Sequence, residues 1–501
     1  MTRPSNDKLK LLQKLLRDKG IEKPTGPSIP RRDPSRDPPL SFGQQRMWFL
    51  QQLEPESSEY NDTLTVRIDG AVLDPALVQR CIAAIVDRHE ILRTAFVPRE
   101  GSAVQRVLPN LDVPLRLVDL TAMAEPQQAA ERQRLWLEDV RGAFVLDRPP
   151  LIRTTLLQLA TDRWEFGLTM HHIASDGVAY TIFFEELGAL YEAFAEGQPV
   201  PLTPLPVQFA DYAAWERQTV SEEVIQRKLA FWRRYLAAPL PEVQLPGTRP
   251  RTGPRSHDGA FRRFEWSPAL FQQLQDFCQR EGVTSHWVLL GAYFALWHRF
   301  SGQEDLLIGT PSSVRSKTEL EHMIGFFVQT LIVRLDISGN PTFREILRRA
   351  QKAQMDASLH EDVPFDRIVQ AIRPGRAAAD APLIQAWIAP MKKLLEPIRV
   401  AGATSSYQIV DPKNARFDIA LILDETEHGC TGYWEYSVDL FDEAAVQRID
   451  QQWIALLQQV LRHPDSTLST IRSTVQRADP AAPAPAAGKR LDLKKIKRRR
   501  G

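Results

Sequence analysis

The stretch from residue 163 to residue 197 changes from a strand pattern to a helix pattern within a few positions. "RWEFGLTMHH" has apolar side chains at every second position, which is the period of a β-strand. "DGVAYTIFFEELGALYEAFAEG" has a helical apolar face and ends at Gly197, a typical helix stop. Strand and helix patterns keep mixing along the chain, so the sequence predicts an α/β fold built in layers.

The chain is expected to divide into two large lobes with extensions at both ends. Its 501 residues exceed one ordinary core, and polar, proline-rich "EGQPVPLTPLP" indicates a lobe boundary. The predicted segments are an amphipathic helix (1–21), a Pro-rich linker (22–39), an N-terminal lobe (40–200), a C-terminal lobe (201–472), and a Pro/Ala linker with a basic tail (473–501).

Charge and cysteine content exclude several classes of protein. Lys and Arg number 63 and Asp and Glu number 62, so the net charge of +1 gives no argument for nucleic acid or an anionic membrane. Three scattered cysteines show neither a disulfide framework nor metal-ligand spacing, which favours a reducing cytoplasm. The sequence contains no apolar run of roughly 18 residues, the length that would predict a membrane span. No metal or nucleotide motif is present.

Strand parity places the adjacent histidines on opposite faces. His172 continues the apolar row, whereas His171 lies on the other face. A partly buried imidazole at a strand end favours its neutral form, which can accept a proton at pH 7. Asp176 is expected to cap the following helix or to pair with an arginine, and Gly177 allows close backbone approach. A purely structural strand-to-helix turn is the alternative.

"HHIASDG" (171–177) resembles the HHxxxDG active-site motif of nonribosomal peptide synthetase condensation domains, which belong to the chloramphenicol acetyltransferase-like superfamily. Further segments are similar to motifs of this family, in the family's order, over about residues 38–470. They are "LSFGQQRMWFL" (40–50), "RHEILRTAF" (88–96), "FADYAAWE" (209–216), "IGFFVQTLIVR" (324–334), "HEDVPFD" (360–366), "RFDIALILDE" (416–425) and "YWEYSVDLFD" (433–442).

The resemblance implies two acetyltransferase-like lobes in a V-shaped pseudo-dimer, with mixed sheets flanked by helices and a central tunnel. It implies no permanently bound cofactor. Donor and acceptor carrier proteins would deliver acyl or peptidyl and aminoacyl groups on phosphopantetheine arms. Attack of the acceptor amine on the donor thioester would then form an amide.

The same resemblance implies roles for individual residues. His172 would position or deprotonate the amine, His171 would support it, and Asp176 would form a structural salt bridge with Arg315. Gly177 would keep the tunnel open, and its backbone N–H is a candidate oxyanion donor. The further candidates for tunnel or substrate contact are Ser175, Gln329, Phe327 and Ser312.

Several positions depart from the family pattern. Val178 and Ala179 stand where the family often has an aromatic residue and serine, Val314 replaces an asparagine, and Gln329 replaces another. These departures leave the donor and the acceptor open, although the opening motifs are closest to the class that takes an L-configured donor. Three alternatives also stay open: a catalytically silent platform that recruits partners, an ester-forming enzyme, and an acyltransferase that uses coenzyme A.

The ends of the chain suggest a free-standing enzyme, with a piece excised from a larger synthetase as the alternative. No adenylation, carrier or thioesterase motif is recognised, and a Pro/Ala linker leads into "KRLDLKKIKRRRG". This basic tail either steers an acidic carrier protein or is solvated and disordered.

Overall fold

The computed structural model describes residues 29–471 with short gaps. Residues 244, 246–248, 250–254, 374–381, 393, 395–402 and 427–428 are not described. The predicted N-terminal helix (1–21) and the Pro/Ala linker with its basic tail (473–501) lie outside the described residues.

The first lobe is built on a sheet that, in the described chain, has five strands in the order β11-β1-β6-β5-β4. Only β4 and β5 are parallel; the other neighbours are antiparallel. The strands are β1 (Asn61–Asp69), β4 (Leu115–Asp119), β5 (Ile152–Ala160), β6 (Arg163–His171) and β11 (Thr404–Ile409). A separate hairpin joins β2 (Thr94–Arg99) to β3 (Ser102–Val107).

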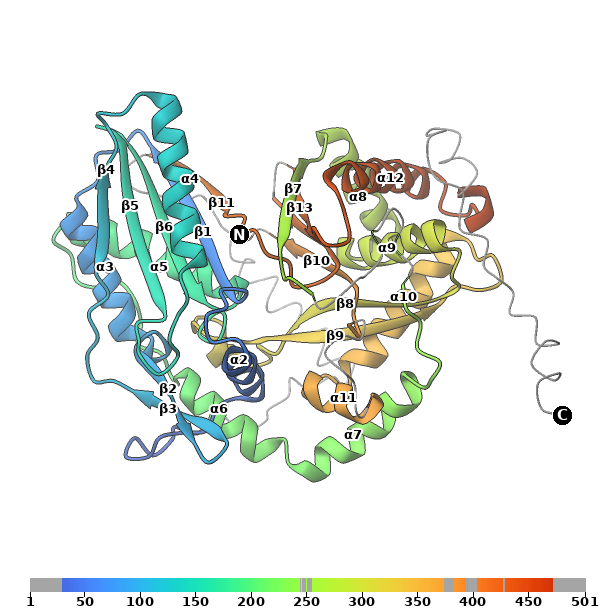
Figure 1. The fold of residues 1–501 in the computed structure, drawn as a ribbon, viewed down its shortest axis with the longest axis horizontal. Helices are drawn as coiled ribbons and strands as arrows, with labels where there is room; N and C mark the ends of the chain where they lie inside the picture. The colour runs from blue at the N-terminus through green and yellow to red at the C-terminus, as the bar shows by residue number, and fades with distance from the viewer. Residues whose placement is uncertain are drawn as a thin grey trace.

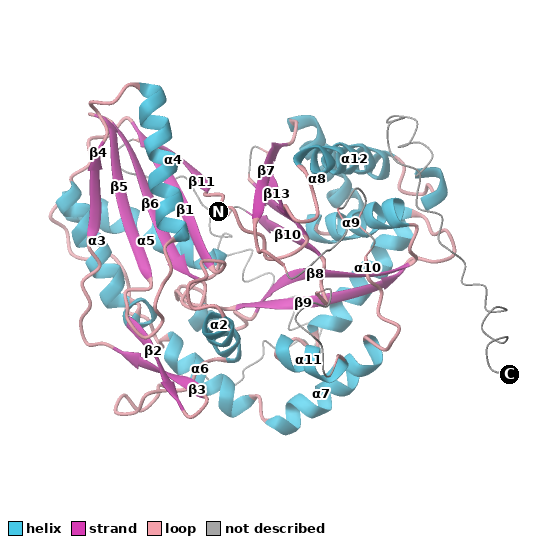
Figure 2. Cartoon of the chain, viewed as in Figure 1, coloured by secondary structure: helices cyan, strands magenta, loops and turns pink. Residues whose placement is uncertain are grey.

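Helices cover both faces of this sheet (Figures 1 and 2). The helices of this lobe are α2 (Phe42–Leu53), α3 (Pro75–Arg88), α4 (Glu125–Arg141), α5 (Gly177–Ala195) and α6 (Phe209–Thr219). The alternating apolar row of β6, including Phe166 and Leu168, is buried with α3 and α5 in one core. On the opposite face, Trp136 of α4 packs over Gly167 and donates a hydrogen bond to Glu165 at 2.7 Å.

The described residues of the second lobe form a six-stranded sheet in the order β7-β13-β12-β10-β8-β9. Pairs β8–β10 and β10–β12 are parallel, so the sheet is mixed. The strands are β7 (Gly259–Glu265), β8 (Asp305–Ser313), β9 (Val328–Asp336), β10 (Ala386–Lys392), β12 (Ile419–Glu425) and β13 (Cys430–Ser437). The helices are α7 (Glu222–Tyr235), α8 (Pro268–Glu281), α9 (Ser285–Ser301), α10 (Phe343–Ser358), α11 (Phe365–Ile372) and α12 (Glu443–Arg462).

Helix α9 lies at the centre of the second lobe, where α8, α10 and α12 and the sheet surround it. Its sequence is apolar on nearly all sides because a helix enclosed in this way has no solvent face. Tyr293 and Trp297 of α9 are fully buried there. The predicted α/β fold with mixed sheets and flanking helices is therefore confirmed.

Segments from the second half of the chain also build the first lobe. Strand β11 pairs with β1, and the segment 320–327 packs into the first core. In Figure 1, β11 lies at the edge of the first sheet, and β8 and β9 extend from the second lobe toward α2. The two lobes are thus interlocked rather than joined by a single linker.

The described part of the predicted linker, residues 29–39, packs on the first lobe. Ile29 is buried, and Arg32 forms ion pairs with Glu90 and Asp211 at 2.8 and 3.0 Å. The prolines in this stretch prevent a regular helix or strand, but they do not prevent docking of an extended chain. The packed part of the structure thus begins earlier than residue 40.

Candidate active site

A cavity of about 280 Å³ lies between the lobes. Its described walls come from both sheets and from the turn between β6 and α5. They include Asp62, His172, Gly177, Gln329, Trp387 and Arg416. Clefts and cavities lined by apolar side chains and a few polar groups are the usual form of a substrate site.

His172 follows the last residue of β6 and presents a neutral imidazole to this cavity. Its backbone N–H donates to the carbonyl of Tyr60 at 2.7 Å, which fixes the main chain. Its Nδ1 lies 2.6 Å from the carbonyl oxygen of Ser175 and therefore carries the ring proton. Nε2 is left with its lone pair, and burial lowers the pKa of His172 below the usual value. His172 can therefore act as a base at neutral pH.

His171 is fully buried and faces away from the cavity. The backbone N–H of Ile173 donates to Nδ1 at 3.0 Å, so the ring proton lies on Nε2, which donates to Gln51 at 3.1 Å. Burial, followed by the neighbouring His172, lowers the pKa of His171 to about 3. This histidine is held in one neutral form and supports the turn.

Asp176 ties the start of α5 to the second half of the chain. Its carboxylate accepts from the backbone N–H of Ala179 at 2.9 Å as the helix N-cap. It also accepts from Arg315 at 3.1 Å and from the backbone N–H of Phe327 at 3.1 Å. Arg315 in turn donates to the carbonyl of Leu320 at 2.7 Å. The structure thus brings together the two residues that the sequence analysis paired.

Gly177 begins α5 and lies on the cavity wall. A Cβ atom at this position would lie 3.7 Å from Leu394 and 3.9 Å from Met391, which are ordinary van der Waals contacts. Alanine would therefore fit, whereas a larger side chain would extend into the cavity. The first N–H groups of a helix lack intrahelical acceptors and carry partial positive charge.

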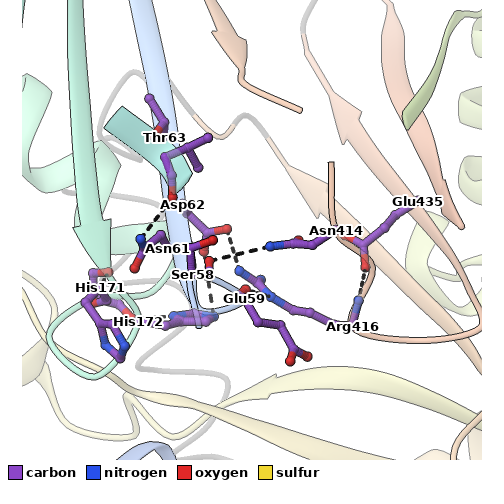
Figure 3. Close-up of polar contacts among 12 residues, drawn as sticks. Ser58, Glu59, Asn61, Asp62, Thr63, His171, His172, Asn414, Arg416 and Glu435 are labelled. Carbon is purple, nitrogen blue, oxygen red and sulfur yellow. Dashed lines mark hydrogen bonds and ion pairs between the residues drawn. The ribbon is translucent and has the colours of Figure 1, made fainter. Parts of the chain in front are cut away.

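Asp62 and Arg416 form an ion pair in the cavity that the sequence analysis did not identify. Arg416 Nη2 donates to Asp62 Oδ1 at 2.6 Å, and Asp62 Oδ2 lies 3.9 Å from His172 Nε2 (Figure 3). Burial acts to raise the pKa of Asp62, but Arg416 and then His172 outweigh it and hold this pKa below the usual value. Asp62 is therefore a carboxylate beside the imidazole.

The sequence gives a signal at each of these two positions but none for their pairing. Arg416 begins the family-like segment "RFDIALILDE". Asp62 shares strand parity with Leu64 and Val66 on the buried face of β1, where a charged side chain is unusual. Arg416 lies 354 positions later, just before β12. Nothing in the local pattern at either position indicates that the two side chains meet.

The other predicted contact residues fall into two groups. Gln329 lines the cavity, whereas Ser175, Phe327 and Ser312 are not among its described lining residues. Ser175 is buried and its hydroxyl donates to the carbonyl of His171 at 3.2 Å. Phe327 is buried in the aromatic core, and Ser312 donates to Glu361 at 2.5 Å. Each of these three side chains therefore contacts other residues of the protein and is not part of the described cavity wall.

Residues 35–480 match the sequence model of the condensation domain family. The chain belongs to the condensation domain family. The family predicted from the motifs is therefore confirmed. Members of this family in nonribosomal peptide synthetases are acyltransferases that form amide bonds between carrier-bound substrates.

Two relatives illustrate the context of this condensation domain. It is 38% identical over 438 residues to one of the linear gramicidin synthase proteins of Brevibacillus parabrevis, covering 86% of this chain and 8% of that protein. It is 35% identical over 447 residues to phosphinothricin tripeptide synthetase PhsC of Streptomyces viridochromogenes, covering 89% of this chain and 41% of that protein. The chain therefore spans less than half of each of these relatives.

Solved structures share the fold of this condensation domain. The X-domain from teicoplanin biosynthesis superposes with a TM-score of 0.76 at 27% identity, covering 89% of this chain and 99% of that one. The first condensation domain of the CDA synthetase superposes with a TM-score of 0.77 at 21% identity, covering 87% of this chain and 98% of that one. The X-domain has also been solved in complex with OxyB.

Within the residues that the structure describes, none of the helices is both long and apolar enough to cross a bilayer. Over the same residues, no group of three or more His, Cys, Asp or Glu side chains is arranged to hold a metal ion.

Proposed function

We propose that this condensation domain joins an acyl or peptidyl thioester to the amine of an aminoacyl group, forming an amide. Donor and acceptor carrier proteins deliver both groups on phosphopantetheine arms, and the domain itself holds no permanent cofactor. The observation that carries the proposal is the lone pair of His172 Nε2, which faces the cavity between the lobes while Ser175 fixes Nδ1.

In the proposed reaction, the acceptor nitrogen attacks the thioester carbonyl carbon and passes a proton to His172. The carbonyl oxygen becomes negatively charged, and the backbone N–H of Gly177, at the N-terminal end of α5, is the donor proposed for it. The carbon–sulfur bond then breaks, and His172 returns the proton to the leaving thiolate. Much of the described cavity wall is apolar, and substrates bound against it would displace water that could hydrolyse the thioester.

The proposed function is tested by loading a candidate donor onto its carrier protein and offering acceptors both carrier-bound and free. Mass spectrometry of the wild-type reaction should show an amide product. Product formed from coenzyme A thioesters, without a carrier protein, would instead indicate a small-molecule acyltransferase. No product from any cognate pair would favour a platform that binds a partner protein; the related X-domain has been solved in complex with OxyB.

The ionisation of His172 gives a separate prediction. Because burial favours the neutral imidazole, protonation of His172 should have its midpoint below the ordinary histidine value of about 6.5. The imidazole of His172 therefore stays mostly neutral as the pH falls from 7, until the pH reaches this lowered midpoint. A pH titration of the protein with ¹⁵N-labelled histidines measures the midpoint, and His172→Gln identifies the signal by removing it.

His257 serves as the internal comparison in this titration. It lies 2.9 Å from Glu59, and the hydrogen bond between them raises the pKa of His257 above the usual value. The two midpoints should therefore lie on opposite sides of about 6.5. A midpoint for His172 at or above that of His257 would contradict the assignment of a buried neutral base.

A further inference from the structure

The side chains of Asp62 and His172 are spaced to contact one small group together. Asp62 Oδ2 and His172 Nε2 are 3.9 Å apart, which is too far for a hydrogen bond between them. An atom placed between them can lie about 2.9 Å from each, which is a normal hydrogen-bond length. Both residues line the cavity, and Figure 3 shows dashed lines from Asp62 to both His172 and Arg416.

Asp62 is held firmly in this position. Its Oδ1 accepts from Arg416, which also donates to the carbonyl of Glu59 at 3.1 Å. The backbone N–H of Arg416 donates to Glu435 at 2.7 Å, and the hydroxyl of Tyr180 donates to the backbone carbonyl of Asp62 at 2.6 Å. These bonds fix the carboxylate so that its second oxygen, Oδ2, faces the imidazole.

His172 Nε2 and Asp62 Oδ2, the two atoms on either side of the gap, both accept hydrogen bonds. His172 Nε2 offers a lone pair because Nδ1 carries the proton, and Asp62 Oδ2 belongs to an ionised carboxylate. A primary amine has two N–H hydrogens and can satisfy both acceptors, whereas a hydroxyl group has only one hydrogen to donate. We propose that Asp62 and His172 form a two-acceptor site that selects a primary amine over a hydroxyl group as the attacking nucleophile.

This inference rests on the proposed function and assigns the nucleophile class. As the carbon–nitrogen bond forms, one N–H proton passes to His172 Nε2, while Asp62 keeps its hydrogen bond to the second N–H. The carboxylate also offsets the positive charge that develops on nitrogen and then on the imidazole. The carbon–sulfur bond breaks, the proton returns to sulfur, and the products are an amide and a thiol.

The test compares two acceptors that differ in one group, an aminoacyl thioester and its 2-hydroxyacyl analogue with the same side chain. The kcat/KM for amide formation is divided by that for ester formation, in wild type, Asp62→Asn and Asp62→Ala. We expect Asp62→Ala to reduce this ratio at least about tenfold, as expected for losing a hydrogen bond to a charged group. The intrinsic difference in reactivity between an amine and a hydroxyl group cancels when the ratio of each variant is divided by that of wild type.

Asp69→Ala provides the matched control. Asp69 lies on the same strand, is paired with Arg67 at 3.0 Å, and is not among the described lining residues of the cavity. Its ratio should equal that of wild type. Asp62→Asn keeps the size of the side chain and an acceptor oxygen, so it should fold and give an intermediate ratio.

The remaining outcomes separate this inference from the proposed function. If Asp62→Ala lowers kcat/KM equally for both acceptors, Asp62 only supports Arg416 and the local fold. This result would overturn the inference and leave the proposed function standing. A wild-type preference for the hydroxyl acceptor would overturn it as well. If wild type gives no product with either acceptor, the proposed function fails first and the inference fails with it.

Discussion

Replacing His172 with alanine is expected to slow condensation by about 10²- to 10⁴-fold, the usual contribution of a positioned general base. The substitution removes the Nε2 lone pair from the cavity. The backbone bond from residue 172 to Tyr60 does not depend on the side chain and should remain. Single-turnover assays with a carrier-loaded donor, followed by product mass, measure the loss.

His463→Ala is the control for this substitution, because His463 is exposed at the end of α12. Both variants should melt close to wild type, and His463→Ala should keep the wild-type rate. Undiminished product from His172→Ala would exclude the role of general base and leave His172 a positioning or structural group.

Replacing Arg315 with methionine should destabilise the protein by about 3–5 kcal/mol, the typical cost of breaking a buried ion pair from one side. The side chains of Arg315 and Asp176 are 7% and 5% exposed, so the remaining carboxylate would lose its cationic partner in a buried position. A large decrease in the denaturation midpoint is therefore expected, measured in urea by tryptophan fluorescence.

Arg134→Met distinguishes this effect from the loss of any arginine. Arg134 pairs with Glu131 and Glu138 on the exposed surface of α4, where solvent screens the charges. The urea denaturation midpoint of Arg134→Met should remain close to that of wild type. Equal shifts in the two variants would contradict the importance of the buried pair.

Features that depend on neighbouring residues were predictable from the sequence. Asp74 and Pro75 are residue types typical of an N-cap and a first helical position, and the structure places them there at the start of α3. The change from period two to helical spacing likewise predicted β6 followed by α5. In each case the information lies within one strand, one turn or one helix.

Features of the site that depend on distant residues or on backbone atoms were not predictable in this way. The pairing of Asp62 with Arg416 requires the two lobes to be assembled. Ser175 was predicted as a tunnel or substrate contact, but its hydroxyl is buried and its carbonyl oxygen orients His172. A sequence pattern identifies side chains and gives no direct information about which main-chain atoms are used.

The interlocked arrangement of the lobes also has a consequence for synthesis of the chain. The carboxylates of Asp62 and Asp176 both lie in the first half of the sequence, whereas their partners Arg416 and Arg315 lie in the second. During translation, which proceeds from the N-terminus, the first lobe emerges before either arginine has been made. Its sheet also lacks β11 until residue 409 has been added. The active site therefore becomes complete only after Arg416 has been added to the chain.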